Sequence, residues 1–204
     1  MSTLVEAMAP EARTGHRLLY AAASMVAGSL LIAALAQVSI TLPFTPVPIT
    51  GQTLGVLLVG ASLGPLLGGA SVLLYLAMGA IGLPVFARGA SGVDVLRMSS
   101  ATGGYLWGFV LAAVVVGWLS RKGWDRSIRS SLGAMLLGEI VIFAVGIPWL
   151  MAALDVPVQK ALEFGLYPFV IGDTLKLLLA AALLPAAWRV AGPSAGLGAP
   201  ARPA

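Results

Sequence analysis

Apolar residues run along the chain in stretches of about 20, and short polar or proline-rich segments separate these stretches. A helix of roughly 20 mainly apolar residues is long enough to cross the hydrocarbon core of a bilayer. The pattern therefore predicts an all-α integral membrane protein with six transmembrane helices. They are expected at residues 17–37, 50–66, 67–83, 103–120, 131–154 and 168–190. The second and third are short and contain much glycine, and Pro65 marks the turn between them.

The segments outside these helices differ in composition. The connection 40–50 has three prolines and no charge, the connection 83–105 is long with glycines and arginines, and 121–130 is basic. A polar, acidic lead, 1–16, precedes the first helix and is expected to be cytoplasmic rather than a cleavable signal. The tail 191–204 is rich in Gly, Pro and Ala, which predicts disorder. One membrane domain, 17–190, is left between them.

Composition supports the bilayer as solvent. Hydrophobic residues make up 59% of the chain and charged residues 10%, whereas a soluble domain carries about 25% charged residues. The net charge of +4 is attributed to basic cytoplasmic loops, not to nucleic-acid binding. The absence of cysteine excludes disulfides, thiolate catalysis and cysteine metal sites. The single histidine, His16, argues against a histidine metal site, so no metal is predicted.

The distribution of Lys and Arg predicts the orientation, because cytoplasmic loops of membrane proteins carry the excess of these residues. With the N-terminus inside, the outer loops hold three, namely Arg88, Arg97 and Lys160, and Lys176 lies within the last helix. The cytoplasmic side then holds eight: Arg13, Arg17, Arg121, Lys122, Arg126, Arg129, Arg189 and Arg202. Both termini are therefore expected in the cytoplasm, and three irregular outer loops could form a ligand entrance.

The last apolar segment contains an acid and a base, Asp173 and Lys176, three residues apart. Residues at this spacing lie on one helix face. A charge in the middle of a membrane helix costs roughly 2.5–3.5 kcal/mol on insertion scales. One interpretation is a structural ion pair within the helix, or a lysine that reaches the interface. The other is a pair that faces a cavity and binds a polar ligand, with carboxylate acceptors and ammonium donors.

Other polar residues at membrane depth are few. Gln52 and Thr53 open the second segment, and the run Thr102, Gly103, Gly104 and Tyr105 opens the fourth. Free backbone N–H groups at such a helix start could bind an anion. The two glycines could equally serve close helix packing, since small residues dominate contacts between membrane helices.

Three further residues stay without a firm assignment. Glu139 in the fifth segment could pair with a basic loop residue or be protonated, and we do not place it in the site. Trp149 and Tyr167, like Tyr105, could stack on a ligand ring. Trp149 and Tyr167 could as well belong to the aromatic belt at the membrane interface.

Four stretches together resemble the BioY family, the biotin-specific S components of energy-coupling factor (ECF) transporters. They are "PFTPVPITGQTLGVLLVGA" (43–61), "GAIGLPVFARGASG" (79–92), "ATGGYLWGF" (101–109) and "YPFVIGDTLKLLLAA" (167–181). They occur in family order, and the resemblance extends from about residue 17 to residue 190. One departure is Ala101, where the family usually has proline before Thr-Gly-Gly-Tyr.

The resemblance implies six helices, biotin binding without catalysis, no cofactor, and a bacterial-type cell membrane. In the family, an aspartate and a lysine three apart in the last helix bind biotin, and they match Asp173 and Lys176. An arginine after the third helix also takes part. Arg88 fits its register better than Arg97, and both remain candidates. Biotin offers ureido N–H donors and a carbonyl for the acid–base pair, and a carboxylate for an arginine.

The resemblance also implies partners, namely a transmembrane coupling subunit and ATP-binding cassette ATPases. The chain has no GxxxxGK[ST] motif, so ATP hydrolysis requires another subunit. Small residues four apart in the first helix, Ala23 and Ala27, are candidates for docking the coupling subunit, or for packing within the bundle. Two other classes stay open. An intramembrane enzyme could use only Asp173, Lys176, Glu139 and serines, because no span contains cysteine or histidine. A passive pore would need charge rings or polar stripes on several helices, whereas the polar residues cluster at one end.

Overall fold

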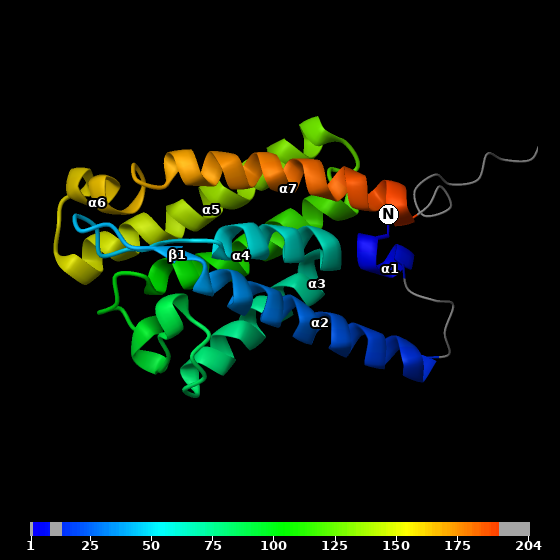
Figure 1. The fold of residues 1–204 in the computed structure, drawn as a ribbon, viewed down its shortest axis with the longest axis horizontal. Coiled ribbons are helices and arrows are strands. Elements are labelled where there is room, and N and C mark those ends of the chain that lie inside the picture. Colours follow the sequence, from blue (N-terminus) through cyan, green and yellow to red (C-terminus); the bar gives the residue numbers. More distant parts are fainter. Residues whose placement is uncertain (1, 9–13, 192–204) are drawn as a thin grey trace, which may run out of the picture.

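The computed structural model describes residues 2–8 and 14–191. Figure 1 shows a bundle whose long helices run along one axis, with α1 at one end and α6 at the other. Five helices are long and apolar enough to cross a membrane: α2, whose apolar part is Arg17–Gln37, and α3, α4, α5 and α7. The elements are α1 (Leu4–Met8), α2 (Thr14–Gln37), β1 (Ser39–Ile40), β2 (Ile49–Thr50), α3 (Gln52–Ala80), η1 (Ala87–Gly89), η2 (Val93–Leu96), α4 (Gly103–Arg121), α5 (Ile128–Leu154), α6 (Val158–Gly165) and α7 (Val170–Ala191).

Helix α3 contains both of the short glycine-rich segments that the sequence predicts as separate helices. The break lies at Gly64, whose φ of 80° and ψ of −179° are not helical, followed by Pro65, which has no N–H to donate. The two halves lie side by side, since Gln52 Nε2 donates to the hydroxyl of Tyr75 at 2.6 Å. A Cβ on Gly68 would lie 2.9 Å from the Cα of Gly60. The predicted turn is confirmed, and the second and third predicted helices are the two halves of α3 on either side of it.

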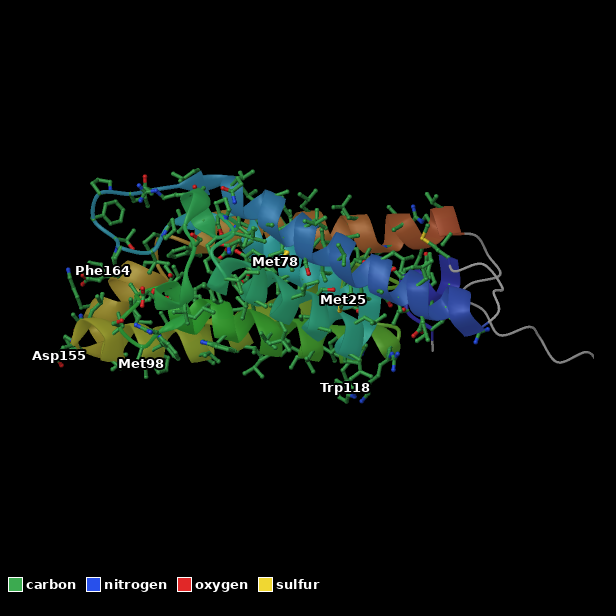
Figure 2. The ribbon with its side chains drawn as sticks, turned by 90° about the horizontal axis from the view of Figure 1, so that it is seen from below. Met25, Met78, Met98, Trp118, Asp155 and Phe164 are labelled. Carbon is green, nitrogen blue, oxygen red and sulfur yellow. The ribbon has the colours of Figure 1, made fainter. Side chains whose placement is uncertain are left out.

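The bundle is held together by small residues that let helices approach closely. Gly117 of α4 packs against the backbone of Gly64 and Pro65, and Gly138 of α5 packs against Leu57 of α3. Such contacts are the usual ones between membrane helices. The outward surface is apolar, as lipid contact requires, with Leu66, Ile171 and many other large side chains exposed. Figure 2 places Trp118 towards one end of the bundle and Asp155 at the other.

Three short elements were not predicted from the sequence: α1, α6 and the β1–β2 pair. Helix α1 lies in the predicted polar lead, yet Thr3 at its start is fully buried. Thr3 N donates to Glu6 Oε2 at 2.9 Å and Glu6 N to Thr3 Oγ1 at 3.3 Å, the reciprocal pattern of a capping box. Glu6 also accepts from Arg121 Nη2 at 3.0 Å, so α1 is tied to the end of α4. The predicted disorder of the tail concerns residues 192–204, which lie outside the described residues.

Candidate functional site

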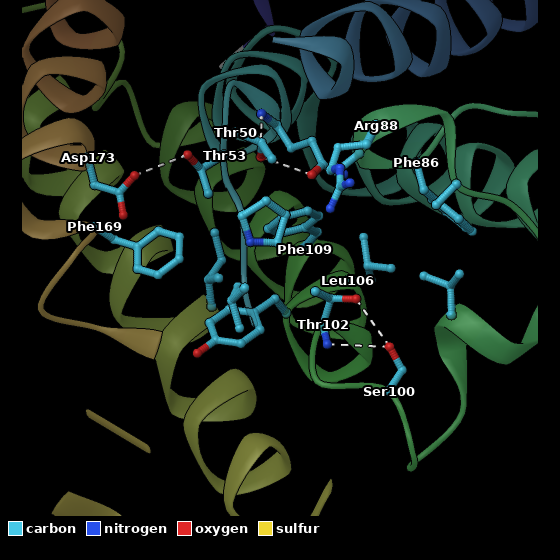
Figure 3. Close-up of a pocket in the computed structure, with 18 of the residues that line it drawn as sticks. Thr50, Thr53, Phe86, Arg88, Ser100, Thr102, Leu106, Phe109, Phe169 and Asp173 are labelled. Atoms are coloured by element: carbon cyan, nitrogen blue, oxygen red, sulfur yellow. Dashed lines mark hydrogen bonds between the residues drawn. The ribbon is translucent and has the colours of Figure 1, made fainter. Parts of the chain in front are cut away.

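A cavity of about 420 Å³ opens at the end of the bundle where α6 lies. It is lined by the connection that includes β2, by the connection between α3 and α4, by Phe169 just before α7, and by residues of α3, α4, α5 and α7, so no single element forms it. Figure 3 shows Asp173 and Phe169 on one side and Arg88 and Phe86 on the other. The polar lining residues are Thr50, Gln52, Thr53, Arg88, Ser100, Thr102, Tyr105, Asp173 and Lys176.

The acid–base pair of α7 lines this cavity, and a third residue, Thr53, contacts both of its members. Lys176 Nζ donates to Asp173 Oδ1 at 2.6 Å and to Thr53 Oγ1 of α3 at 3.1 Å. The Thr53 hydroxyl also lies 3.5 Å from Asp173 Oδ1. Asp173 is 5% exposed, and its second oxygen, Oδ2, has no protein partner. The pair is thus both an intrahelical ion pair and a cavity wall, with one buried acceptor and one ammonium hydrogen left for a ligand.

Gln52 lies at the same cavity, but its polar atoms are engaged by the protein. Its Nε2 donates to the Tyr75 hydroxyl at 2.6 Å, and its Oε1 accepts from Thr50 Oγ1 at 2.9 Å. The amide is therefore fixed in one orientation. This favours a role in shaping the cavity over a direct polar contact, although its binding role stays a prediction.

Of the two candidate arginines, only Arg88 lines the cavity. Its backbone is left-handed, with φ 62° and ψ 25°, a conformation that costs a non-glycine residue about 1–2 kcal/mol. Arg97 forms an exposed ion pair with Asp94 at 2.6 Å, away from the lining. The geometry therefore favours Arg88 as the cation that meets a ligand.

The start of α4 is divided between the cavity and the helix interface. Thr102 and Tyr105 line the cavity, and the Tyr105 hydroxyl donates to the carbonyl of Gly165 at 3.0 Å. Gly103 and Gly104 do not line it and instead pack against Trp149. The structure thus favours close packing for the glycines, and an anion site on their N–H groups is only a prediction.

The remaining aromatic and acidic candidates lie outside the cavity lining. Trp149 Nε1 donates to Ser100 O at 3.0 Å, which ties α5 to the loop before α4. Tyr167 is exposed. Glu139 is 3% exposed and neither of its oxygens has a protein partner. Asp173 and Lys176 are the charged residues that act on it electrostatically.

Sequence reasoning missed the large apolar walls, which come from η2, α4, α5 and the connections before β2, η1 and α7. They are Val47, Pro48, Phe86, Val95, Leu106, Phe109, Ile142, Phe143 and Phe169. Thr53 was noted at the start of the second segment but not placed in the site. Nothing in the local sequence separates such residues from others in apolar stretches. Only the fold brings them together.

The arrangement suits an elongated ligand with a polar head, an apolar body and an anionic end. Asp173 can accept from an N–H donor, Lys176 can donate to a carbonyl, and Arg88 can pair with a carboxylate on the opposite side. A mostly apolar cavity with a few converging polar groups is typical of small-molecule sites. Among residues 2–8 and 14–191, no three His, Cys, Asp or Glu residues are grouped to hold a metal.

Comparisons with known proteins point the same way. A model described as "BioY family" matches residues 8–193. "Biotin transporter BioY" of Rhizobium etli is 35% identical over 151 residues, which are 71% of this chain and 79% of that protein. The protein of the same name from Thermotoga maritima is 38% identical over 142 residues, 70% and 81% of the two chains. A crystal structure of "the S-component for biotin from an ECF-type ABC transporter" superimposes with a TM-score of 0.78 at 27% identity, covering 87% of this chain and 95% of that one.

Proposed function

The chain belongs to the BioY family, and from this premise we propose that it binds biotin as the membrane subunit of an ECF-type vitamin transporter. It is a multi-pass protein of the plasma membrane and a transport component rather than an enzyme. Its sequence has no GxxxxGK[ST] motif, so separate ATP-binding cassette ATPases supply the energy.

The observation that carries this proposal is the unpartnered Oδ2 of Asp173 inside a closed Asp173–Lys176–Thr53 cluster. A ureido N–H can donate to that oxygen and a ureido carbonyl can accept from Lys176. The bicyclic ring and valeryl chain then lie among the apolar walls, and the biotin carboxylate meets Arg88. Each part of the ligand thereby has a complementary group.

Biotin binding to the purified protein in detergent tests the proposal. We expect saturable binding with one site per chain, measured by calorimetry and by displacement of labelled biotin. Lipoic acid, which has a similar carboxylate chain but no ureido ring, is the matched control and should not compete. Absence of both heat and displacement would contradict the proposed function.

We further propose six membrane crossings with both termini in the cytoplasm. The two halves of α3 run in opposite directions, so each contributes one crossing. Of the described Lys and Arg residues other than Lys176, three lie at the cavity end: Arg88, Arg97 and Lys160. Six lie at the other end: Arg17, Arg121, Lys122, Arg126, Arg129 and Arg189. This asymmetry supports a cytoplasmic assignment for the α1 end.

The lack of cysteine makes this topology directly testable. Ser91 near the cavity and Ser127 before α5 are both exposed. In intact cells, a membrane-impermeant maleimide should label Ser91→Cys but not Ser127→Cys. After lysis, it should label both variants. The reverse pattern would show the opposite orientation.

Docking of the coupling subunit on α2 is supported by the exposure of Ala23 and Ala27. Ala27 also lines an apolar groove of about 370 Å³ between α2, α3 and α7. We propose that a helix of the coupling subunit lies there. Ala23→Trp with Ala27→Trp should abolish co-purification with the coupling subunit and spare biotin affinity. Leu111→Trp, at an exposed position of α4, is the control. Loss of biotin binding with intact assembly would contradict this assignment.

A further inference from the structure

Tyr75 is fully buried in the second half of α3 and does not line the cavity. It is nevertheless in contact with two residues that do, Gln52 and Phe86. These two residues belong to different walls of the cavity. Tyr75 therefore lies between the start of α3, where Thr53 accepts from Lys176, and the loop that carries Arg88.

The hydroxyl side of Tyr75 fixes the start of α3. Its oxygen accepts from Gln52 Nε2 at 2.6 Å, and the other end of that amide accepts from Thr50. Thr53, which follows Gln52 in the chain, accepts from Lys176 Nζ at 3.1 Å. The Tyr75 hydroxyl is thus linked, through two adjacent residues of one helical turn, to the position of the ammonium group.

The ring side of Tyr75 fixes the loop of Arg88. The Tyr75 and Phe86 rings meet edge-to-face, with centroids 5.5 Å apart and planes at 85°. Phe86 also closes the turn around Arg88, since its N–H donates to Ala90 O and its carbonyl accepts from Gly89 N, both at 3.1 Å. A side chain on Gly79 would overlap the Phe86 ring, so this ring has little freedom to move.

We propose that Tyr75 is a positioning residue that fixes the separation between the Asp173–Lys176 pair and Arg88, and so sets the length of ligand that the cavity accepts. This inference rests on the proposed function. A ligand with a polar head and a carboxylate must reach both groups at once. A rigid separation rejects a chain that is too short or too long, whereas a loosely held arginine adapts to either. Figure 3 shows the two groups on opposite sides of the cavity, as this requires.

The experiment compares biotin with norbiotin, which has one methylene fewer in its chain, and homobiotin, which has one more. The wild type should prefer biotin about 10-fold or more over each, the discrimination that one methylene typically allows. Tyr75→Leu and Phe86→Leu remove the ring contact, and the ratio of biotin to homobiotin affinity should fall about 5-fold. Tyr75→Phe keeps the ring and loses the hydroxyl, so affinities for all three ligands should fall together and the ratios should persist.

Val72→Ala, at another fully buried position of the same half-helix, is the matched control. It should lower the melting temperature and leave the ratios unchanged, as a purely structural residue would. Unchanged ratios in folded Tyr75→Leu and Phe86→Leu, or no length preference in the wild type, would overturn the inference. Tyr75→Met, which removes the same ring contact, decides if Tyr75→Leu does not fold, because Phe86→Leu also alters the cavity wall itself. If the wild type binds no biotin at all, it is the proposed function that fails.

Discussion

Two buried aspartates occupy opposite ends of the molecule, and their surroundings differ in one respect. Asp125, between α4 and α5, accepts from Trp188 Nε1 at 2.6 Å on Oδ2, and Arg126 Nε lies 3.4 Å from its Oδ1. The Arg126 guanidinium in turn lies 3.4 Å above the Trp188 ring. Asp173 also has a cation beside it and one oxygen without a hydrogen-bond partner, but this residue lines the cavity.

The comparison shows what separates a structural acid from a binding one when both are buried and paired. Around Asp125, Trp188 donates to one oxygen and the Arg126 side chain covers the other, which has no hydrogen-bond partner. Around Asp173, Lys176 donates to one oxygen, and the residue lines the cavity from which a ligand donor can reach the other. Burial, an adjacent cation and one oxygen without a hydrogen bond are common to both, and the position at the cavity is the distinguishing feature.

The largest expected effect is on biotin binding by Asp173→Asn. In one orientation, the NH₂ group of the amide faces the N–H donor of the ligand. In the other orientation, it faces the ammonium of Lys176. Either way, two donors face each other and buried groups are left unpaired. We expect biotin affinity to fall about 100-fold, or roughly 2.7 kcal/mol. Titration calorimetry on a monodisperse sample measures it. Asp125→Asn is the matched control and should keep wild-type affinity. Equal affinity loss in both variants would remove the distinction between the two acids.

The next effect concerns the far side of the cavity. Arg88→Ala should weaken biotin about 10-fold, because a charge-assisted contact to the carboxylate is lost at a partly solvated site. Biotin amide has no carboxylate, so its affinity should change much less. Arg97→Ala, whose side chain pairs with Asp94, should leave both ligands unaffected. A larger effect of Arg97→Ala would transfer the assignment to that residue.

The cluster of Asp125, Arg126 and Trp188 should contribute to the stability of the folded protein. In Asp125→Asn, the amide oxygen can still accept from Trp188, but the negative charge beside the Arg126 guanidinium is lost and the buried ion pair with it. We expect about 1–3 kcal/mol of lost stability, seen as a lower melting temperature in detergent. Asp94→Asn, at an exposed pair, should change it by less than about 1 kcal/mol. An unchanged melting temperature for Asp125→Asn would show that the cluster is dispensable.

The smallest effect is a pH dependence of that stability. Burial raises the pKa of Asp125 above its ordinary value of 3.8, although Trp188 and Arg126 oppose this shift. The folded protein then holds the proton more tightly than the unfolded chain, so stability falls as pH rises from about 3.8. Asparagine has no such proton. The melting temperature of the wild type, relative to Asp125→Asn, should therefore decline from pH 4 towards neutrality. A rise would mean that the ion pair outweighs burial.

Much of the fold follows from local sequence because each long helix is a continuous apolar segment. The ends of α4 and α5 agree with the predicted spans within three residues, as does the turn near Pro65. The break itself lies at Gly64, since glycine tolerates the positive φ and the proline need only follow. Helix α1 was missed because five residues in a polar lead carry no apolar repeat. It buries Thr3 and Leu4 and pairs with Arg121, which is distant in the sequence.

The site could be predicted only in part, for a related reason. Asp173 and Lys176 are visible because charges in a membrane helix are rare, and their spacing already places them on one face. Thr53, which accepts from Lys176, lies 123 residues away from it in the sequence. The aromatic walls are ordinary apolar residues until the fold brings them together. Tyr75 gives no signal at all, because its role depends on two contacts across the bundle.

The hydrogen bond from Trp149 to Ser100 has a spectroscopic consequence. This indole is anchored to the loop whose next residues line the cavity, so its emission should report on ligand entry. Trp188 is held between a carboxylate and a guanidinium at the other end, where its quenching reports on the integrity of that cluster. Two of the five tryptophans thus lie in distinct environments, and difference spectra of Trp149→Phe and Trp188→Phe against the wild type would separate occupancy from unfolding in one optical titration.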